Sequence, residues 1–320
     1  TTSTNLDLTR HETGVIFEGE VDDTVDVDWF VVEFAPLTVT APNGTELWKV
    51  GETQNITWKH SKDLETGGTC TAGAGPQHKL KLELCQDGAT CASPLLINGD
   101  VCAHLDTYAW TIPETISATS VIGNALRVLI TDLDMTVRRT DMSNTNFEIK
   151  GTLDLTAPDG GEIWFVGDTG RNITWNYTAQ LGNLSLYYDT ASGGGGYPTL
   201  IASAVAYGSG GTGSYNWNPI PDLPYTTMRV KVVQESDTAV FDTSAADFEI
   251  RPSITITAPD LGTEVWLAQT SNNITWTSTG TIPGVDLYYS TNTGVDWVLI
   301  ESNYTTGSPY PWTVSVAAIG

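Results

Sequence analysis

The side chains with the most distinctive chemistry are four cysteines that lie close together in the sequence. They fall within one 33-residue window, and no two of them are spaced as CxxC: Cys70, Cys85, Cys91 and Cys102. An even, clustered set without a redox or metal-ligand spacing predicts two disulfides, and hence an oxidising compartment. Of the possible connectivities, the turn QDGAT favours a bond between Cys85 and Cys91. Cys70 would then pair with Cys102.

A zinc site is the alternative use of these thiols, because His60, His78 and His104 lie nearby. Structural zinc is usually held by closely spaced pairs of Cys and His ligands. The chain has no CxxC or HxxxH pattern, so the spacing favours disulfides over zinc. Free buried thiols are a further alternative.

No residues form a pattern typical of catalysis. The chain lacks GxSxG, HExxH and GxxxxGK[ST], and no carboxylate pair stands out among its 38 acidic residues. We therefore expect no enzymatic activity, no cofactor and no assigned metal ligand. Acidic clusters at residues 21–28 and 131–136 offer oxygen atoms to calcium, but without EF-hand spacing they are more typical of solvated turns.

Seven N-x-S/T sequons are candidate sites for N-linked glycans. Asn55, Asn172 and Asn273 hold the same place in a repeated NITW sequence, so a glycan on each would shield equivalent surfaces. The alternative is that these residues are simply polar strand positions. The seven sites are Asn43, Asn55, Asn172, Asn176, Asn183, Asn273 and Asn303.

The chain is strongly acidic, with a formal net charge of -24. Nucleic acids and anionic membrane surfaces are bound by clustered Lys and Arg, which are scarce here, so neither is an expected partner. No run of about 18 apolar residues is present to span a bilayer. The first residues lack the basic start and apolar core of a signal peptide, so an exported protein would be in its mature form.

The sequence repeats one unit three times. The copies are LTVTAPNGTELWKVGETQNITW (37–58), LDLTAPDGGEIWFVGDTGRNITW (153–175) and ITITAPDLGTEVWLAQTSNNITW (254–276). Each opens with the alternation of a half-buried strand, which a proline ends because it cannot donate to a ladder. A turn and a second short strand with a tryptophan follow. These prolines and tryptophans are Pro42, Pro158 and Pro259, and Trp48, Trp164 and Trp266.

Within NITW, the two-residue period of a strand puts Ile and Trp on one face and Asn and Thr on the other. We therefore expect Trp58, Trp175 and Trp276 to anchor three separate cores. About seven short strands per copy, without a helical period, predict an all-β chain of tandem immunoglobulin-like antiparallel β-sandwiches. The expected domains span residues 37–150, which include the Cys-rich insert, residues 151–252 and residues 253–320.

The repeated pattern resembles a known module. The order TAP, glycine, Trp, VG, NITW, YxW, RV and FEI is similar to the Kre9/Knh1-type immunoglobulin-like modules of Ser/Thr-rich cell-surface proteins, over residues 37–320. This resemblance implies an extracellular, surface-associated protein without enzymatic activity. The third copy departs at Gln269, where the others have Gly51 and Gly167, so a different turn is possible there.

The third copy stops just after its YPW strand and lacks the last two strands of the others. Residues 1–36 show the missing pattern, two strands around an acidic turn at Asp22 and Asp23, with Phe30 in the place of Phe248. We expect residues 1–36 of one chain to complete the third sandwich of the next and so build a head-to-tail extracellular filament or pilus-like thread. The expected donor residues are Val15, Phe17, Phe30 and Val32.

Other interpretations stay open. The chain can be a window of a longer tandem array, a closed dimer, or a sandwich closed within one chain. It can also be a surface adhesin or a polysaccharide-binding fragment, with the Cys-rich insert as the adhesive element. Outward-facing aromatics that could stack on a sugar would come from Tyr187, Tyr188, Tyr288 and Tyr289.

Overall fold

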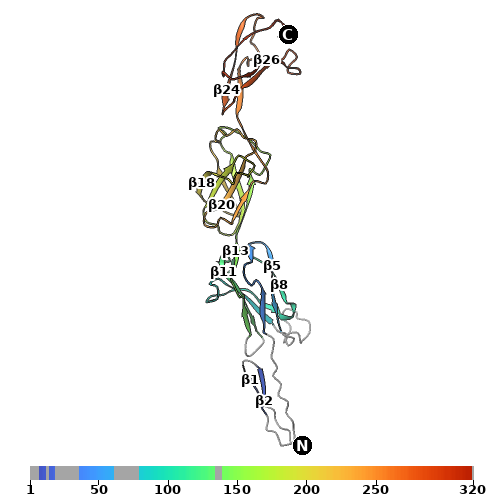
Figure 1. Ribbon diagram of the computed structural model, residues 1–320, viewed down its shortest axis with the longest axis vertical. Helices are drawn as coiled ribbons and strands as arrows, with labels where there is room; N and C mark the ends of the chain where they lie inside the picture. Colours follow the sequence, from blue (N-terminus) through green and yellow to red (C-terminus); the bar gives the residue numbers. More distant parts are fainter. Residues whose placement is uncertain (1–6, 12–13, 19–35, 61–78, 134–138, 319–320) are drawn as a thin grey trace. The chain divides into compact units, whose positions relative to one another are not determined.

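The computed structural model describes residues 7–11, 14–18, 36–60, 79–133 and 139–318. They form two compact units, one of residues 1–152 with 178–180 and one of residues 153–177 with 181–320. Nearly all regular structure is β-strand, as the alternating patterns predict, and helix is limited to single turns such as η2 (Ala103–Leu105) and η3 (Val316–Ala318). We keep the names first, second and third domain for residues 37–150, 151–252 and 253–320 (Figure 1).

The first domain is a sandwich of two main sheets. One sheet has the strand order β3 (Thr38–Ala41), β5 (Thr53–Lys59) and β8 (Thr107–Thr111). The other has the order β4 (Leu47–Lys49), β13 (Phe147–Lys150), β11 (Gly123–Asp132), β6 (Lys79–Cys85) and β7 (Leu95–Cys102), with β12 (Thr140–Met142) paired to β11. A small ribbon of β9 (Thr115–Ile116) and β10 (Thr119–Ser120) completes it.

The second domain repeats this arrangement. Its first sheet has the order β14 (Thr152–Ala157), β16 (Asn172–Thr178) and β19 (Thr212–Asn216). Facing it are β18 (Thr199–Val205), β17 (Leu184–Asp189), β20 (Arg229–Gln234) and β21 (Phe241–Thr243), and the parallel pair β15 (Ile163–Phe165) with β22 (Glu249–Arg251). The second and the last strands of this domain, β15 and β22, are therefore paired with each other.

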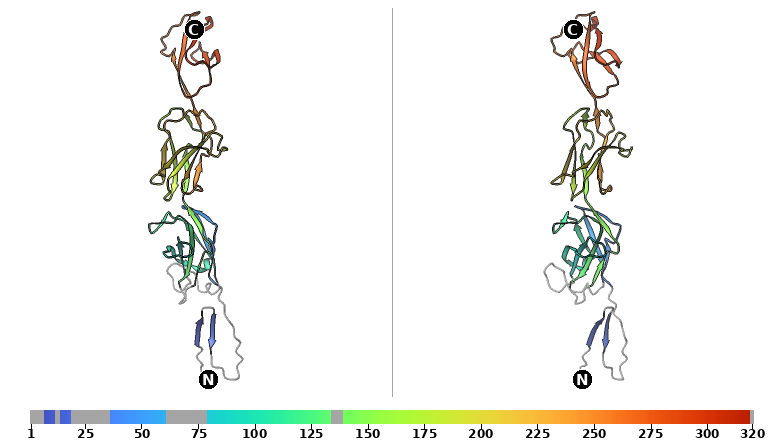
Figure 2. Two further views of the ribbon diagram at one scale, coloured as in Figure 1. Left: turned by 60° about the vertical axis from the view of Figure 1, so that its left-hand side comes forward. Right: turned by 90° about the vertical axis from the view of Figure 1, so that its left-hand side faces the viewer.

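The third domain keeps the first sheet but only part of the second (Figure 2). The first sheet has the order β23 (Ser253–Ala258), β24 (Ser271–Thr279) and β27 (Tyr310–Thr313). The opposing layer, within the described residues, is the hairpin β25 (Val285–Tyr289) with β26 (Val298–Tyr304). The residues that the structure describes include no counterparts of β20, β21 and β22 in this layer.

Ahead of the first domain lies a separate hairpin. Its strands β1 (Asp7–His11) and β2 (Gly14–Glu18) pair antiparallel along all five residues. The strand β2 matches the expected start of the donor segment, whereas β1 was not expected. Of the expected donor residues, Val15 and Phe17 lie on β2, and Phe30 and Val32 lie outside the described residues.

The prolines and tryptophans of the repeat organise the two complete cores. The strands β3, β14 and β23 end at the alanine before the TAP proline, as predicted. In the first domain Trp48 packs on Phe147 with ring centroids 4.9 Å apart, and in the second Trp164 packs on Phe248 at 5.1 Å. Each pair lies inside a continuous buried cluster, so the first and the second domain each have a core of their own.

The short strand expected around Trp266 is absent, and this prediction was wrong. Residues 263–267 form no strand in the third domain. In the other domains the equivalent strands, β4 and β15, pair in parallel with β13 and β22. A three-residue strand has no other ladder to join, so without a last strand it does not form.

The turn at Gln269, by contrast, is the same as in the other copies. Gly51, Gly167 and Gln269 have φ angles of 89°, 79° and 64°. In every domain the amide of this residue donates, over 2.8–2.9 Å, to a carbonyl just after the YxW strand. The left-handed conformation costs a residue with a Cβ roughly 1 kcal/mol, and the retained hydrogen bond offsets part of that cost.

The difference between the complete and the partial core predicts different responses to the same substitution. Trp175 is fully buried and donates to the Tyr207 carbonyl at 2.9 Å, whereas Trp276 is half-buried. We expect Trp175→Ala to lower the free energy of unfolding of the second domain by about 3–5 kcal/mol. Trp276→Ala should cost the third domain clearly less, because less apolar area is lost. Urea unfolding of the isolated chain, followed by NMR signals of each domain, measures both, and equal losses would contradict the partial core.

Candidate functional site in the third domain

The complete second domain shows what its last strands contribute. The strand β20 lies between β17 and β21, and six residues of β17 face six residues of β20 across the ladder. The last strand, β22, pairs with β15, and Phe248 just before it covers Trp164. These strands therefore satisfy the edge of β17 and close the apolar core at once.

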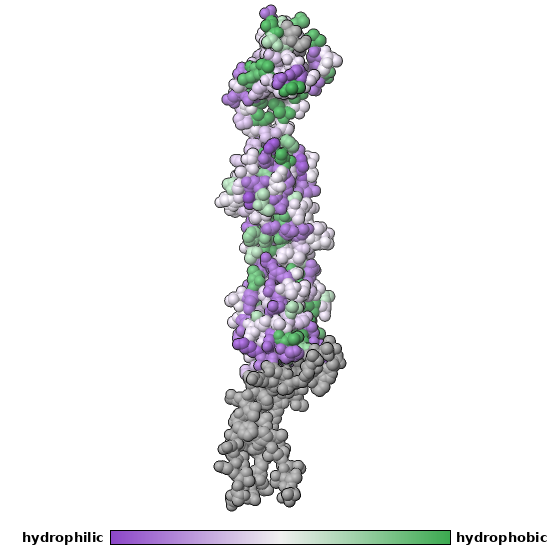
Figure 3. All heavy atoms as spheres, turned by 90° about the vertical axis from the view of Figure 1, so that its right-hand side faces the viewer, coloured by the Kyte–Doolittle hydropathy of each residue, from purple (hydrophilic) through white to green (hydrophobic). Residues whose placement is uncertain are grey.

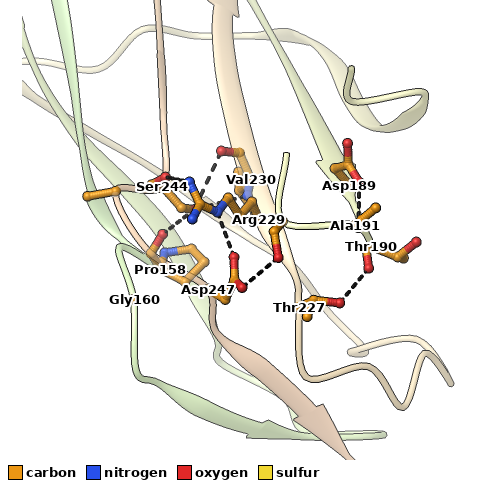
Figure 4. A network of polar contacts seen from close by, with 12 residues as sticks. Pro158, Gly160, Asp189, Thr190, Ala191, Thr227, Arg229, Val230, Ser244 and Asp247 are labelled. Carbon is orange, nitrogen blue, oxygen red and sulfur yellow. Dashed lines mark hydrogen bonds and ion pairs between the residues drawn. The ribbon is translucent and has the colours of Figure 1, made fainter. Parts of the chain in front are cut away.

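Two side chains of this last segment also hydrogen-bond to the first strand and its TAP turn. The carboxylate of Asp242 accepts from the Leu155 N–H at 2.7 Å. The buried hydroxyl of Ser244 donates to the Pro158 carbonyl at 2.7 Å and accepts from the Val230 N–H at 2.9 Å (Figure 4). One carboxylate and one hydroxyl, two residues apart, thus join the last strand pair to the start of the domain.

The first domain makes the same two contacts. Asp141 accepts from the Val39 N–H at 2.7 Å, and Ser143 donates to the Pro42 carbonyl at 2.6 Å. The Asp-x-Ser sequence is therefore a repeated structural device. We did not identify it from the sequence, although TDMSNTNF and FDTSAADF both place an Asp six residues before the buried Phe.

An ion pair supports this segment in the second domain. Arg229 Nε donates to Asp247 Oδ1 at 2.6 Å, and the Ser192 hydroxyl donates to the other carboxylate oxygen at 2.7 Å (Figure 4). The hydrogen bond from Arg229, followed by that from Ser192, lowers the pKa of Asp247. The same bond raises the pKa of Arg229, so both groups stay charged at neutral pH.

In the third domain the partners of these contacts are missing. The counterparts of Leu155 and Pro158 are Ile256 and Pro259. Among the described residues, no side chain hydrogen-bonds to the Ile256 N–H or to the Pro259 carbonyl. The first strand of this domain thus presents one donor and one acceptor that the complete domains satisfy with Asp and Ser.

The apolar face of the third domain is correspondingly uncovered. Ile254 and Ile256 on β23 are 49% and 55% exposed, whereas Leu153 and Leu155 on β14 are 8% and 3% exposed. The loop around Trp266 is more open still, with Val265 at 83%. Apolar patches are visible on this domain at the top of Figure 3. We call the uncovered face of β23, β25 and residues 259–267 the open edge.

The turn that borders the open edge is ordered by its own glutamate. Glu264 Oε1 accepts from the N–H groups of Asp260 and Leu261, each at 3.0 Å. Glu46 and Glu162 cap the equivalent turns of the other domains in the same way. Hydrogen bonds from the amides of Leu261 and then Asp260 lower the pKa of Glu264 to about 2.

The cysteine prediction is confirmed where the structure describes it. Cys85 and Cys91 form a disulfide across the predicted turn. Cys102 is also disulfide-bonded, and Cys70 lies outside the described residues. Because these thiols are oxidised, the zinc alternative loses its ligands. Within the described ranges, no group of three or more His, Cys, Asp or Glu is placed to hold a metal ion.

Most of the sequons are accessible to modification. Asn43 is half-buried, and its side-chain oxygen accepts from the Asn144 N–H at 2.6 Å, so it has a structural role in the turn. The exposed sequon asparagines are Asn55, Asn172, Asn176, Asn183, Asn273 and Asn303.

The tyrosine pairs divide between core and surface. Tyr188 stacks on Trp217 with centroids 5.7 Å apart, and Tyr289 lies 5.4 Å from Trp312. Tyr187 and Tyr288 take the other face, where Tyr288 is exposed and Tyr187 half-buried. The expected split of each pair is therefore present, but Tyr187 and Tyr288 belong to separate domains.

Comparison with known proteins identifies no family for this chain. No family model and no curated protein matches the sequence. Similar solved structures include extracellular domains 3–5 of Drosophila OTK (11% identity, 88% of this chain, 91% of that chain, TM-score 0.28). They also include Clostridium thermocellum CbhA fibronectin(III)-like modules (15% identity, 67% of this chain, 94% of that chain, TM-score 0.22). A third example is the three N-terminal domains of the bacteriophage RB49 capsid protein Hoc (12% identity, 84% of this chain, 79% of that chain, TM-score 0.23).

The sheets themselves establish an all-β chain of tandem immunoglobulin-like sandwiches. At these identities and TM-scores the similar structures say nothing about activity or partner. No helix among the described residues is long and apolar enough to cross a bilayer.

The low pKa of Glu264 gives a test of the turn at the open edge. The pKa in the folded chain is below the ordinary value of a glutamate, 4.5, so the capping bonds are fully formed above pH 4.5 and are lost only as the pH falls through about 2. We expect the NMR shifts of the Leu261 and Asp260 amides to titrate with a midpoint near 2. Glu264→Gln should remove this titration. A midpoint near 4.5 would show that the carboxylate does not cap these amides.

Proposed function

We propose that the chain is the structural subunit of an extracellular filament, or pilus-like thread, that polymerises head to tail by donor-strand complementation. The observation that carries this proposal is the open edge of the third domain. Ile254 and Ile256 are exposed where Leu153 and Leu155 of the second domain are buried, and in the described part of the chain no counterpart of β20 pairs with the layer β25–β26.

Physical chemistry favours covering such an edge. Unpaired strand edges present a row of N–H and C=O groups that template pairing with another chain, and folded proteins rarely leave them open. An added strand would satisfy these groups, and its alternate side chains would fill the gap beside Trp266. Burial of apolar surface contributes roughly 25 cal/mol per Å², so the exposed Ile254 and Ile256, whose counterparts Leu153 and Leu155 are buried, add to the driving force.

The N-terminal segment of a second copy is the occupant that we favour. It contains the hairpin of β1 and β2, and its sequence FVV at residues 30–32 follows the Phe-x-Ile spacing of Phe248 and Ile250. Donor and acceptor are different surfaces of the chain. Such a heterologous contact does not close on itself and propagates into an open filament.

Other features fit an extracellular setting. The chain contains the Cys85–Cys91 disulfide, which persists in oxidising compartments. Its net charge of -24 opposes lateral sticking between filaments. The resemblance to surface-associated immunoglobulin-like modules agrees with a structural and non-enzymatic role at the cell surface.

Removal of the donor tests the proposal. A chain without residues 1–36 should fail to polymerise, because no segment remains to complete the third domain of its neighbour. Sedimentation and negative-stain electron microscopy of the full and the shortened chain, at equal concentration, measure this. The full chain with Thr238→Ala, an exposed position of the second domain, is the control, and it should polymerise like the unchanged chain.

Filaments that persist after the deletion would refute donor-strand complementation by this segment. A full chain that stays monomeric and binds glycans on an array would instead support the alternative function, a surface adhesin or polysaccharide-binding fragment.

The exposed sequons give a second test of the extracellular assignment. In material from its natural source, we expect glycans on Asn55, Asn172 and Asn273, which share one outward-facing position of their sheets. Peptide mass spectrometry before and after enzymatic deglycosylation measures the occupancy. Unmodified asparagine at all three positions would contradict glycan shielding of this face.

A further inference from the structure

The outer face of the hairpin β25–β26 carries two exposed aromatic side chains (β26 is labelled in Figure 1). Trp297, directly before β26, is 62% exposed, and Tyr288 on β25 is 47% exposed. Across the ladder Tyr288 pairs with Leu299, which is also exposed. Alternate residues of a strand point to one face, so Trp297 shares the face of Leu299 and is the diagonal neighbour of Tyr288. We call Tyr288, Trp297 and Leu299 the aromatic face.

The complete second domain shows that this face is exposed whether or not the last strands are present. There the counterpart of Leu299 is Leu200, with nearly the same exposed fraction, 49% against 51%. The counterpart of Trp297 is Pro198, which is exposed as well. Both lie at β18, the edge strand of its sheet. The exposure of the aromatic face is therefore a property of the sandwich.

The fold does not require a tryptophan at this place. By the same register the counterparts of Trp297 are Pro198 in the second domain and Pro94 in the first. Neither proline belongs to the buried clusters of its domain. A large aromatic ring at an exposed place that proline fills elsewhere is more typical of a contact surface than of packing.

The turn of the hairpin holds Trp297 and a neighbouring carboxylate in place. The Asp296 N–H donates to Asn292 Oδ1 at 2.9 Å, and Asn292 Nδ2 donates to Asp296 Oδ2 at 2.7 Å. A Cβ on Gly294 would lie 3.4 Å from Trp297 Cζ2, so the indole rests against the turn. A ligand would therefore meet groups that are already ordered, which lowers the entropic cost of binding.

Carboxylates flank the aromatic face at both ends. Asp296 is exposed and directly precedes Trp297, and Asp286 is exposed and lies two residues before Tyr288, on the same face of β25. The sequence of residues 253–318 contains no Lys, Arg or His. The face thus combines aromatic rings with negative charge that no side chain of its own domain neutralises.

This combination fits a cationic ligand. An ammonium or guanidinium group is attracted to the face of an aromatic ring within about 6 Å, and most strongly to tryptophan. The second domain makes such a contact within the chain, where Lys231 Nζ lies 4.3 Å from the centroid of the Phe241 ring. The formal net charge of -24 adds a long-range attraction for positive partners. A neutral sugar would use the rings but gain nothing from the carboxylates.

The size of the face limits the partner to a short segment. A stable interface between folded proteins buries about 800 Å² per partner, and a whole aromatic side chain supplies about 150–250 Å². Three side chains that are only partly exposed fall short of such an interface. A second copy of this chain is disfavoured further, because it brings the same negative charge.

We propose that the aromatic face binds a Lys- or Arg-bearing segment of another protein. A cationic side chain of that segment lies over the Trp297 ring, and its charge is balanced by Asp296 and Asp286. The site lies on the outer side of the hairpin, whereas the open edge lies toward the core, so this binding does not depend on polymerisation.

A trilysine peptide with a neutral fluorophore tests the proposal on the full chain. Fluorescence anisotropy gives its affinity for single chains and for filaments alike. We expect Trp297→Ala to weaken binding about tenfold, and Trp297→Phe to weaken it less because a ring is kept. Asp296→Asn should weaken binding about threefold, since one exposed charge is lost. A trilysine peptide acetylated on its side chains should not bind.

Asp154→Asn is the matched control variant. Asp154 is an exposed carboxylate of the second domain that accepts from Asn176 Nδ2 at 3.1 Å, much as Asp296 accepts from Asn292. The variant removes the same charge from a face without an aromatic pair, so it should bind trilysine like the parent. An unchanged circular dichroism spectrum would show that each variant is folded.

Two outcomes would overturn the proposal. If Asp154→Asn weakens binding as much as Asp296→Asn, or if Trp297→Ala binds like the parent, trilysine recognises only the net charge. If trilysine does not bind while a neutral oligosaccharide such as cellohexaose binds and is lost in Trp297→Ala, the aromatic face is a sugar platform instead. Neither outcome bears on polymerisation, which the deletion of residues 1–36 tests separately.

Discussion

The structure depends on the hydrogen bonds that join the end of each sandwich to its beginning. In the second domain Ser244 reaches the Pro158 carbonyl and Asp242 reaches the Leu155 N–H. Each bond alone contributes about 1 kcal/mol, but together they fix the position of the strand pair that covers Trp164. Closure of the core and pairing of β15 both follow from one short segment.

Within residues 253–318 the third domain has no counterpart of that segment, and the consequences are local. The first sheet, the β25–β26 hairpin and the turn at Gln269 are retained, because their contacts are internal to the part that remains. The strand around Trp266 is lost, because its only ladder partner belongs to the missing part. The first sheet and the hairpin of the repeat therefore form without the last strands, whereas the short strand with the tryptophan forms only when the last strand is present.

Much of this could be predicted from the sequence. The alternation of apolar and polar residues, the TAP prolines and the NITW tryptophans were enough to predict the sandwiches and the position of the first strand, because these signals are local. The Cys85–Cys91 bond followed from a short turn. Asp242, Ser244 and Glu264 were not identified as important. The backbone partners of Asp242 and Ser244 are distant in the sequence. Glu264 caps nearby amides, but nothing in its residue type distinguishes it from the other acidic residues. The strand at Trp266 was wrongly predicted for the related reason that a local pattern cannot show whether its ladder partner exists.

The parallel pairing of β15 with β22 also has a mechanical consequence. The chain enters the second domain at β14 and leaves it through β22, and β22 is hydrogen-bonded to β15, which follows β14 in the sequence. Tension applied between the two ends would pull these parallel strands past each other, so their hydrogen bonds would bear the load together in shear rather than one after another. The hydrogen bonds of Asp242 and Ser244 also join the last part of the domain to its first strand and the turn after it. Each complete sandwich is thus built to resist stretching along the direction of the chain.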